Sequence, residues 1–334
     1  MTTSTRVQPN RDEMDGAHRI ATAIAQSFAA KIVGQDELRE TMLIGLLTSG
    51  HILLEGVPGL AKTTAARALA DSISGGFARI QCTPDLLPGD ILGTQIYDSS
   101  ANAFVTRLGP VHTNIVLLDE INRSSAKTQS AMLEAMEERQ TTIAGTAHPI
   151  PEPFLVIATQ NPVDQEGTYP LSEAQTDRFL LKEVLRYPTP EEEAEVIFRM
   201  DAGVFDRSTP ARPVISLDDM RHLQRLTANI HLDPVLVHYM TQLVHVTRQP
   251  DQFLPPQLAR LVEYGASPRA TVAFARASRA AALLAGRNHV LPDDIRRIAT
   301  RVLRHRLILR FEALSAGVTA ETIIDAVLQS VRVP

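Results

Sequence analysis

Residues 51–64 read HILLEGVPGLAKTT, and this stretch decides the fold. A short apolar run that ends in glycine is typical of a buried strand, and the alanine-rich segment that follows is typical of a helix. Between them, residues 56–63 match the GxxxxGK[ST] pattern of a phosphate-binding loop except at Ala61, where the strict pattern has glycine. Strand, loop and helix in this order are the setting that such a loop requires.

The chemistry of the loop follows from its residue types. Glycines let backbone N–H groups approach an anion, and the helix N-terminus adds positive potential. Lys62 would place a charge on the outer phosphates, and the Thr63 hydroxyl would bind Mg²⁺. The expected nucleotide-binding residues of the loop are Gly56, Val57, Pro58, Gly59, Leu60, Ala61, Lys62, Thr63 and Thr64. The alternative interpretation is an ordinary strand–turn–helix connection.

A second strand-like segment, NIVLLDEIN at 114–122, ends in two adjacent acids. Neither carboxylate fits a fully buried strand. At the C-terminal edge of a parallel sheet, Asp119 could hold Mg²⁺ through water while Glu120 polarises the water that attacks the γ-phosphate. A solvated acidic turn is the alternative to this site.

Further segments extend the pattern of strands and helices. FLVIATQNP at 154–162 predicts a third strand, and residues 124–140 predict an amphipathic helix with Met132, Leu133 and Met136 on its apolar stripe. TTIAGTAHPI at 141–150 predicts a hairpin. Helices are also expected at Ile20–Ile32 and Leu38–Leu47. Strands that alternate with helices predict an α/β fold with a parallel, helix-covered sheet.

The composition changes along the chain and suggests domain boundaries. Residues 1–15 are polar, without apolar periodicity, and predict a flexible N-terminal arm, with ordered structure from Gly16. We expect a nucleotide-binding α/β domain at 16–186, a linker at 187–212 and a helical domain at 213–334. The helices expected in the last domain are 217–231, 234–248, 268–286 and 292–308.

Overall composition excludes several classes of protein. The 334 residues are 44% hydrophobic and 21% charged, as in an ordinary globular protein, and the formal net charge of −5 makes nucleic acid an unlikely partner. The arginine-rich segment 293–310 is interpreted as an amphipathic helix. No apolar run reaches the length of a membrane span and no secretory signal is seen, so we expect a cytoplasmic protein.

Four motifs in register resemble one family. GVPGLAKT, LLDEINR, IATQNP and SEAQTDRF look like the MoxR group of AAA+ ATPases, in which alanine before the loop lysine is common. The resemblance covers roughly residues 30–310 and extends to IVGQDEL, GTYPLSEAQ, ASPRA and VLRHR. It implies an AAA+ P-loop core with a parallel five-stranded sheet covered by helices, followed by a small all-α lid domain. It also implies ATP and Mg²⁺ as cofactors.

The resemblance assigns further roles at matching positions. Asn161 matches the residue that senses the γ-phosphate, Arg178 in TDRF matches the arginine finger, and Arg269 in ASPRA matches the sensor arginine of the lid. Val33 and Gly34 match the segment that lies against adenine. Without the family, Asn161 is interpreted as part of an Asn-Pro turn, Arg178 as a solvated arginine, and Val33 and Gly34 as a helix-breaking turn. Residues 86–112 match an inserted element of the clade.

The function that the resemblance implies is a ring-forming ATPase, with a hexamer expected, that remodels or matures a client protein. Such proteins are often linked to metal-cofactor insertion, with partners that carry a von Willebrand A domain. The motor subunit of a metal chelatase is an alternative, and a non-hydrolysing nucleotide-gated adaptor is another. The adaptor is disfavoured by the joint presence of five residues, Lys62, Asp119, Glu120, Asn161 and Arg178.

Two features suggest chemistry but have simpler explanations. His238 and His245 are about 10 Å apart along a helix axis, too far to share one ion without further ligands, and Pro234 separates them from His231. Cys82, the only cysteine, has no base nearby in the sequence and is expected to be a buried small hydrophobe.

Overall fold

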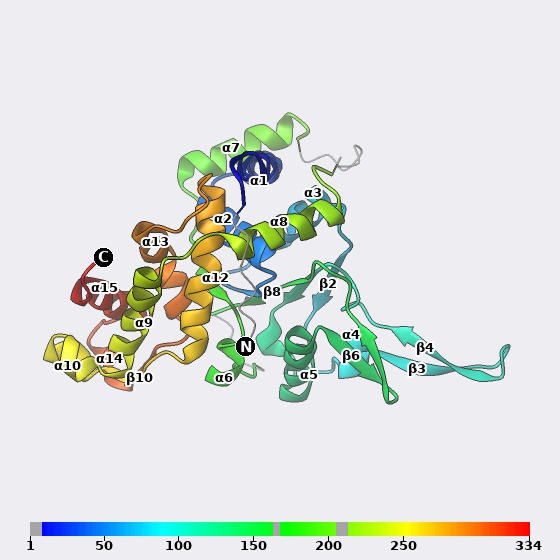
Figure 1. The fold of residues 1–334 in the computed structure, drawn as a ribbon. Helices are drawn as coiled ribbons and strands as arrows, with labels where there is room; N and C mark the ends of the chain where they lie inside the picture. The colour runs from blue at the N-terminus through cyan, green and yellow to red at the C-terminus, as the bar shows by residue number, and fades with distance from the viewer. Residues whose placement is uncertain (1–8, 163–167, 205–212) are drawn as a thin grey trace, which may run out of the picture. The chain divides into compact units, whose positions relative to one another are not determined.

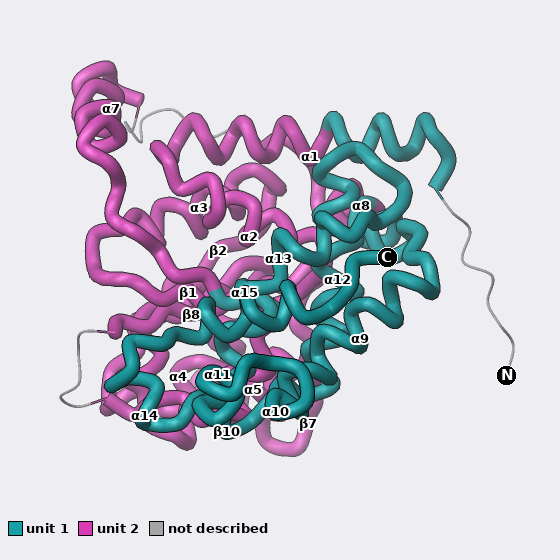
Figure 2. The backbone as a smooth tube through the Cα atoms, turned by 90° about the vertical axis from the view of Figure 1, so that its left-hand side faces the viewer, with its two compact units in different colours: residues 1–19, 180–182, 223–334 teal, residues 20–179, 183–222 magenta. Residues whose placement is uncertain are grey.

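The structure is a computed structural model that describes residues 9–162, 168–204 and 213–334. The remaining parts of the expected arm, of the GTYPLSEAQ run and of the expected linker lie outside the described residues. The chain forms two compact units (Figure 2). One comprises residues 20–179 and 183–222, and the other comprises residues 1–19, 180–182 and 223–334. The domain boundaries expected from the sequence stay predictions.

A five-stranded parallel sheet with the order β2-β5-β8-β1-β9 lies at the centre of the α/β part (Figure 1). Its strands are β1 (Ile52–Glu55), β2 (Phe77–Gln81), β5 (Ile115–Asp119), β8 (Leu155–Gln160) and β9 (Leu181–Val184). The three strands predicted from apolar runs are confirmed as β1, β5 and β8, which are the inner strands. Inner strands are covered on both faces, and this explains why their apolar residues are consecutive.

Side chains alternate between the two faces of the sheet along each strand, and different helices cover the two faces. Val116 and Leu118 share a buried cluster with Met132 and Met136 of α5 (Ala126–Glu138), as the predicted stripe requires. Side chains of opposite parity, including Asp119, point to the other face. There α3 (Lys62–Ser72) packs on β5. The remaining helices of the unit are α2 (Asp36–Thr48), α4 (Pro88–Leu92), η1 (Ile121–Arg123), α6 (Glu173–Thr176) and α7 (Pro190–Asp201).

Two antiparallel hairpins accompany the sheet. The predicted hairpin at 141–150 is confirmed as β6 (Gln140–Ile143) and β7 (Thr146–Pro149). The other hairpin, β3 (Gly93–Asp98) and β4 (Ala103–Leu108), lies within residues 86–112 and extends away from the five-stranded sheet (Figure 1). At its tip, the Tyr97 and Phe104 rings contact edge to face, 5.4 Å between centroids, and both are exposed.

The second unit is mainly helical, as predicted. Its principal helices are α9 (Pro234–Arg248), α12 (Pro268–Leu284), α13 (Pro292–Leu303) and α15 (Ala320–Ser330). Short elements α10 (Pro250–Phe253), α11 (Pro256–Ala259), β10 (Val262–Tyr264), β11 (Ile308–Leu309) and α14 (Phe311–Ser315) connect them. Proline follows the capping residues Asp233 and Ser267, whose side chains accept backbone bonds at the starts of α9 and α12. The predicted α8 (Leu217–Asn229) runs from one unit into the other.

Two helical segments differ from the sequence expectation. α1 (Arg11–Lys31) begins before Gly16, because the Asn10 and Glu13 side chains each accept a bond from the other's backbone N–H at 2.8–2.9 Å. α7 lies inside the segment expected to be a linker and starts with a capping box between Thr189 and Glu192. In both cases a side-chain cap marks the start of the helix. Among the described helices, none combines the length and apolarity that crossing a membrane needs.

Candidate functional site

The loop between β1 and α3 is held in place by backbone contacts and by special conformations. The Gly56 N–H donates to the Gln160 carbonyl at 3.2 Å, which continues the pairing of β1 with β8. Gly59 has φ +92°, a backbone conformation that favours glycine, and a Cβ there would meet no atom within 4 Å, so the space beside this residue is open. Ala61, where the strict pattern has glycine, adopts a left-handed conformation with φ +53°. The loop therefore keeps the glycine-like backbone despite the substitution.

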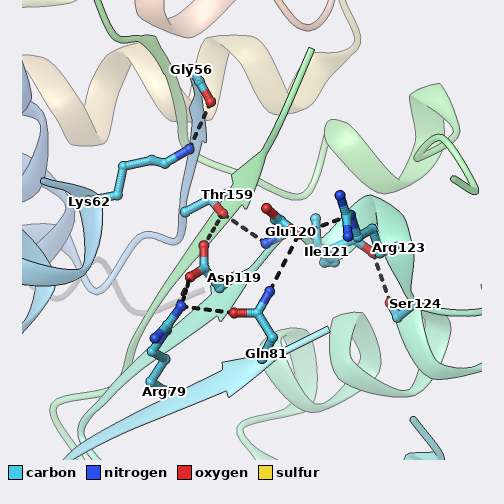
Figure 3. A network of polar contacts seen from close by, with 10 residues as sticks. All are labelled: Gly56, Lys62, Arg79, Gln81, Asp119, Glu120, Ile121, Arg123, Ser124 and Thr159. Atoms are coloured by element: carbon cyan, nitrogen blue, oxygen red, sulfur yellow. Dashed lines mark hydrogen bonds and ion pairs between the residues drawn. The ribbon is translucent and has the colours of Figure 1, made fainter. Parts of the chain in front are cut away.

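Lys62 starts α3 and its side chain turns back into the loop. Its ammonium donates to the Gly56 carbonyl at 2.8 Å, and the residue is buried (Figure 3). Burial lowers the pKa of Lys62, while the charges of Asp119 and Glu120 act in the opposite direction. The loop lysine and the two acids therefore lie near enough to interact electrostatically, as expected if both motifs meet at one edge of the sheet.

Asp119 ends β5 with both carboxylate oxygens occupied by contacts. Its Oδ1 accepts from the Thr159 hydroxyl at 2.8 Å. Its Oδ2 accepts from Nη2 and Nε of Arg79 at 2.6 and 3.1 Å (Figure 3). The side chain is only 12% exposed, so these contacts compensate a largely buried charge.

Glu120 leaves the strand in a left-handed conformation with φ +58°. Its backbone N–H donates to the same Thr159 hydroxyl at 2.8 Å, so one threonine fixes both acids. Its carboxylate pairs with Arg123 at 2.9 Å and accepts a longer contact of 3.4 Å from the Gln81 amide (Figure 3). The solvated acidic turn does not describe this arrangement, because the two acids belong to a connected polar network.

Sequence reasoning missed Arg79, Gln81 and Thr159. In the sheet, Gln81 is paired in register with Asp119, and Arg79 lies two residues earlier on the same face of β2. The Arg79 Nη2 also donates to the Gln81 Oε1 at 2.8 Å, which links the two β2 residues. The sequence signal for Arg79 and Gln81 was the presence of polar residues at alternate positions of FARIQ (77–81). Assigning them to the site requires knowing that β2 lies next to β5.

The remaining residues of the expected site come from several elements. Asn161 follows β8 directly and is buried, at the same edge as the acids. Arg178 follows α6, and its Nε pairs with Glu137 at 3.0 Å while its Nη1 donates to the Ala174 carbonyl. Arg269 is exposed at the start of α12 and belongs to the other unit. The structure therefore places Asn161 at the same edge of the sheet as the acids, and the roles of Asn161 and the two arginines stay predictions.

Val33 and Gly34 lie in the turn between α1 and α2, both half-buried. Gly34 has φ +63°, and a Cβ there would meet the Glu192 carboxylate at 2.2 Å. The neighbouring Gln35 amide donates to the Arg186 carbonyl at 3.0 Å, so the turn is tied to the segment after β9. The helix-breaking turn is real, and contact with adenine stays a prediction.

The donor set fits a nucleotide phosphate with Mg²⁺. The Asp119 carboxylate and the Thr63 hydroxyl are hard oxygen ligands of the kind that Mg²⁺ takes. The open space beside Gly59 and the buried ammonium of Lys62 suit the anionic phosphates. Among the described residues, no group of three or more His, Cys, Asp or Glu side chains could hold a metal ion by itself. A metal here would therefore need phosphate oxygens or water as further ligands.

Cys82 is buried, and burial raises the pKa of its thiol to about 12. Ser124 hydrogen-bonds the thiol and acts in the opposite direction, but burial dominates. The thiol is therefore not activated as a nucleophile, in agreement with its interpretation as a small buried hydrophobe.

Comparison with known proteins agrees with these motifs. A family model described as "ATPase family associated with various cellular activities (AAA)" matches residues 51–181, and an "AAA lid domain" model matches residues 258–327. Chaperone MoxR1 of Mycobacterium tuberculosis is 50% identical, over 91% of this chain and 79% of its own. Protein MoxR of Paracoccus denitrificans is 30% identical, over 91% of this chain and 93% of its own.

The fold agrees as well. The crystal structure of a candidate ATPase from Cytophaga hutchinsonii superposes with a TM-score of 0.90 at 41% identity, covering 97% of each chain. The chain therefore belongs to the MoxR family of AAA+ ATPases.

Proposed function

We propose that the protein hydrolyses ATP with Mg²⁺ in a ring oligomer and uses the energy to remodel or mature a client protein. The observation that carries this proposal is the convergence of Lys62, Asp119 and Glu120 at one edge of the sheet, where Thr159 joins the two acids. A loop that binds phosphates needs the lysine, but only hydrolysis needs a carboxylate beside the attacking water.

Each residue at this edge has a chemical task in the proposed reaction. Backbone N–H groups of residues 56–64 and the Lys62 ammonium bind the phosphates. Thr63 and Asp119 would hold Mg²⁺, which neutralises developing charge on the phosphate oxygens when it is bound. Glu120 accepts a hydrogen bond from the attacking water and polarises it, and Asn161 orients that water.

Two arginines would complete the site in the assembled ring. Arg178 is assigned as the finger that reaches the nucleotide of a neighbouring subunit and stabilises transition-state charge. To do so its guanidinium must leave Glu137, with which it pairs here at 3.0 Å. Arg269 is assigned as the sensor of the lid. We infer a hexamer from the resemblance to ring-forming AAA+ ATPases, with one finger at each subunit interface.

The kind of client and partner is inferred from the relatives and from the family resemblance, and no residue of the site identifies either one. The relative from Mycobacterium tuberculosis is named a chaperone, which supports a chaperone-like role for this protein. Maturation or metal-cofactor insertion, with a partner that carries a von Willebrand A domain, is our proposal for the form this role takes. A cytoplasmic location remains a prediction from the sequence.

Two alternatives have different consequences. A metal-chelatase motor subunit would share the fold and the hydrolytic residues, and it would copurify with a tetrapyrrole-binding subunit. A non-hydrolysing adaptor would bind nucleotide without turnover. The network that fixes Glu120 through Thr159 and Arg123 favours hydrolysis, because an adaptor has no use for an oriented acid.

Phosphate release by the purified protein with ATP and Mg²⁺ tests the proposal. We expect Glu120→Gln to retain ATP binding and to lose turnover by about 100-fold or more, because only the polarisation of water is removed. Lys62→Ala should lose ATP binding. Light scattering on the same samples should give a ring-sized mass.

Glu134→Gln is the matched control, since Glu134 is an exposed acid of α5 outside the network, and it should keep wild-type turnover. Nucleotide binding without turnover in the wild type would favour the adaptor. Equal loss of binding in Lys62→Ala and Glu120→Gln would contradict the separate roles.

A further inference from the structure

We propose that Arg79 is a built-in counter-ion of Asp119 that occupies this carboxylate in the absence of metal and competes with a divalent cation for it. The inference deepens the proposed function, since it concerns the same candidate metal ligand. Arg79 is then a positioning residue that sets how tightly the site takes its cation.

The contact geometry shows that Arg79 occupies one oxygen of the Asp119 carboxylate. Both Nη2 and Nε of Arg79 converge on the Oδ2 of Asp119, at 2.6 and 3.1 Å (Figure 3). The other oxygen accepts from Thr159 at 2.8 Å. Each carboxylate oxygen therefore already has a donor. Because two N–H donors of Arg79 already fill the lone pairs of Oδ2, a cation that binds this oxygen must displace the guanidinium.

Arg79 and Thr159, the two residues that contact the Asp119 carboxylate, differ in how easily they can be displaced from it. The Asp119 side chain is 12% exposed, whereas the Arg79 side chain is 48% exposed and can turn towards water. Thr159 is fully buried and also accepts the Glu120 N–H, so its movement would disturb both acids. Arg79 is consequently the donor that a cation would displace.

The net charge around the two acids also supports competition between Arg79 and a cation. Three cationic side chains, Lys62, Arg79 and Arg123, face two carboxylates. The cluster is thus already more than neutralised before any metal arrives. Because a divalent ion adds two positive charges, its binding is opposed as long as the Arg79 guanidinium stays in contact.

A second contact keeps Arg79 in place without burying it. Its Nη2 donates to Gln81 at 2.8 Å, and both residues lie on the same face of β2. The guanidinium is therefore oriented towards Asp119 from the neighbouring strand rather than by chance on the surface. An exposed ion pair without such support is usually worth little.

The proposal is tested by measuring how tightly the full chain binds Mn²⁺ without nucleotide. The EPR signal of the free ion reports the amount that remains unbound. We expect Arg79→Gln to bind Mn²⁺ about tenfold more tightly than the wild type, because a competing charge is removed. Arg79→Lys should stay near the wild type, since the positive charge is kept. Arg107→Gln removes the same charge from the exposed β4 and should have no effect.

The double variant Arg79→Gln/Asp119→Asn identifies the carboxylate involved. This double variant should not show the tighter Mn²⁺ binding expected of Arg79→Gln alone. Unchanged or weaker Mn²⁺ binding by Arg79→Gln, or a gain that persists in the double variant, would overturn the proposal.

Thermal unfolding in EDTA measures the counter-ion role without any metal. Arg79→Gln should lower the melting temperature by about 2–4 °C when Asp119 is present and by clearly less in the Asp119→Asn background. Equal shifts in both backgrounds would count against the pair. Neither measurement uses nucleotide, so a protein that fails to hydrolyse ATP would contradict the proposed function and leave the Arg79 result standing.

Discussion

Cys82 shows at the scale of one residue how burial controls reactivity. Its thiol lies in the buried cluster beneath the acidic strand, and burial raises its pKa from 9.0 to about 12. Near pH 8 the thiolate fraction is then about a thousandfold lower than that of an ordinary thiol. Removal of the thiol from water, rather than a charged neighbour, dominates this shift.

We therefore expect iodoacetamide to modify Cys82 of the folded protein at pH 8 about a thousandfold more slowly than in urea, as followed by mass spectrometry. The same shift predicts that stability falls as the pH rises above about 9. Between the two pKa values the unfolded chain has lost the proton that the folded chain retains. Cys82→Ala should remove this slope. Rapid alkylation of the native protein would show that the thiol is accessible and ionised.

The β3–β4 hairpin depends on close backbone packing at its base. A Cβ at Gly109 would lie 2.1 Å from the Ile91 carbonyl oxygen and 2.6 Å from the Gly93 nitrogen. Backbone atoms cannot move aside as the end of a flexible side chain can. The Gly109 N–H also donates to the Leu92 carbonyl at 3.1 Å, so a shift would disturb the junction between α4 and β3.

Gly109→Ala should lower the free energy of unfolding by about 1–3 kcal/mol, measured by urea denaturation. Gly89→Ala is the matched control. Gly89 lies in α4, where the nearest heavy atom to an added Cβ is 3.9 Å away, and alanine there should be neutral or slightly stabilising. Equal effects of the two substitutions would mean that the hairpin base adapts without cost.

At the scale of the whole molecule, the proposed ring makes Arg178 and Glu120 members of active sites shared between subunits. A subunit with Arg178→Ala keeps its own acids, and a subunit with Glu120→Gln keeps its own finger. Mixing the two variants should restore part of the ATPase activity, since some interfaces would then have both groups intact. Steady-state phosphate release across mixing ratios measures this recovery.

The control mixes Arg178→Ala with the double variant Glu120→Gln/Arg178→Ala, in which no finger is available at any interface. This mixture should stay inactive. No recovery in the first mixture, in subunits that exchange freely, would place Arg178 outside the neighbouring site.

Much of the fold was predictable because it rests on local patterns. The inner strands are consecutive apolar runs, and the phosphate loop and the acids follow β1 and β5 directly, so their place at one edge follows from a parallel sheet. Arg79 could not be found in this way, since its contact with Asp119 depends on β2 lying next to β5. The start of α1 at Arg11 was missed because a reciprocal cap, not apolar periodicity, defines it.

The single buried cysteine has a practical consequence for spectroscopy. Since this thiol is the only one in the chain and is buried, we expect the native protein to react little with maleimide probes. One added cysteine at Ser100, in the exposed turn between β3 and β4, would take a fluorophore or spin label selectively. The environment of that hairpin could then be recorded with and without nucleotide, while every native residue of the candidate site stays in place.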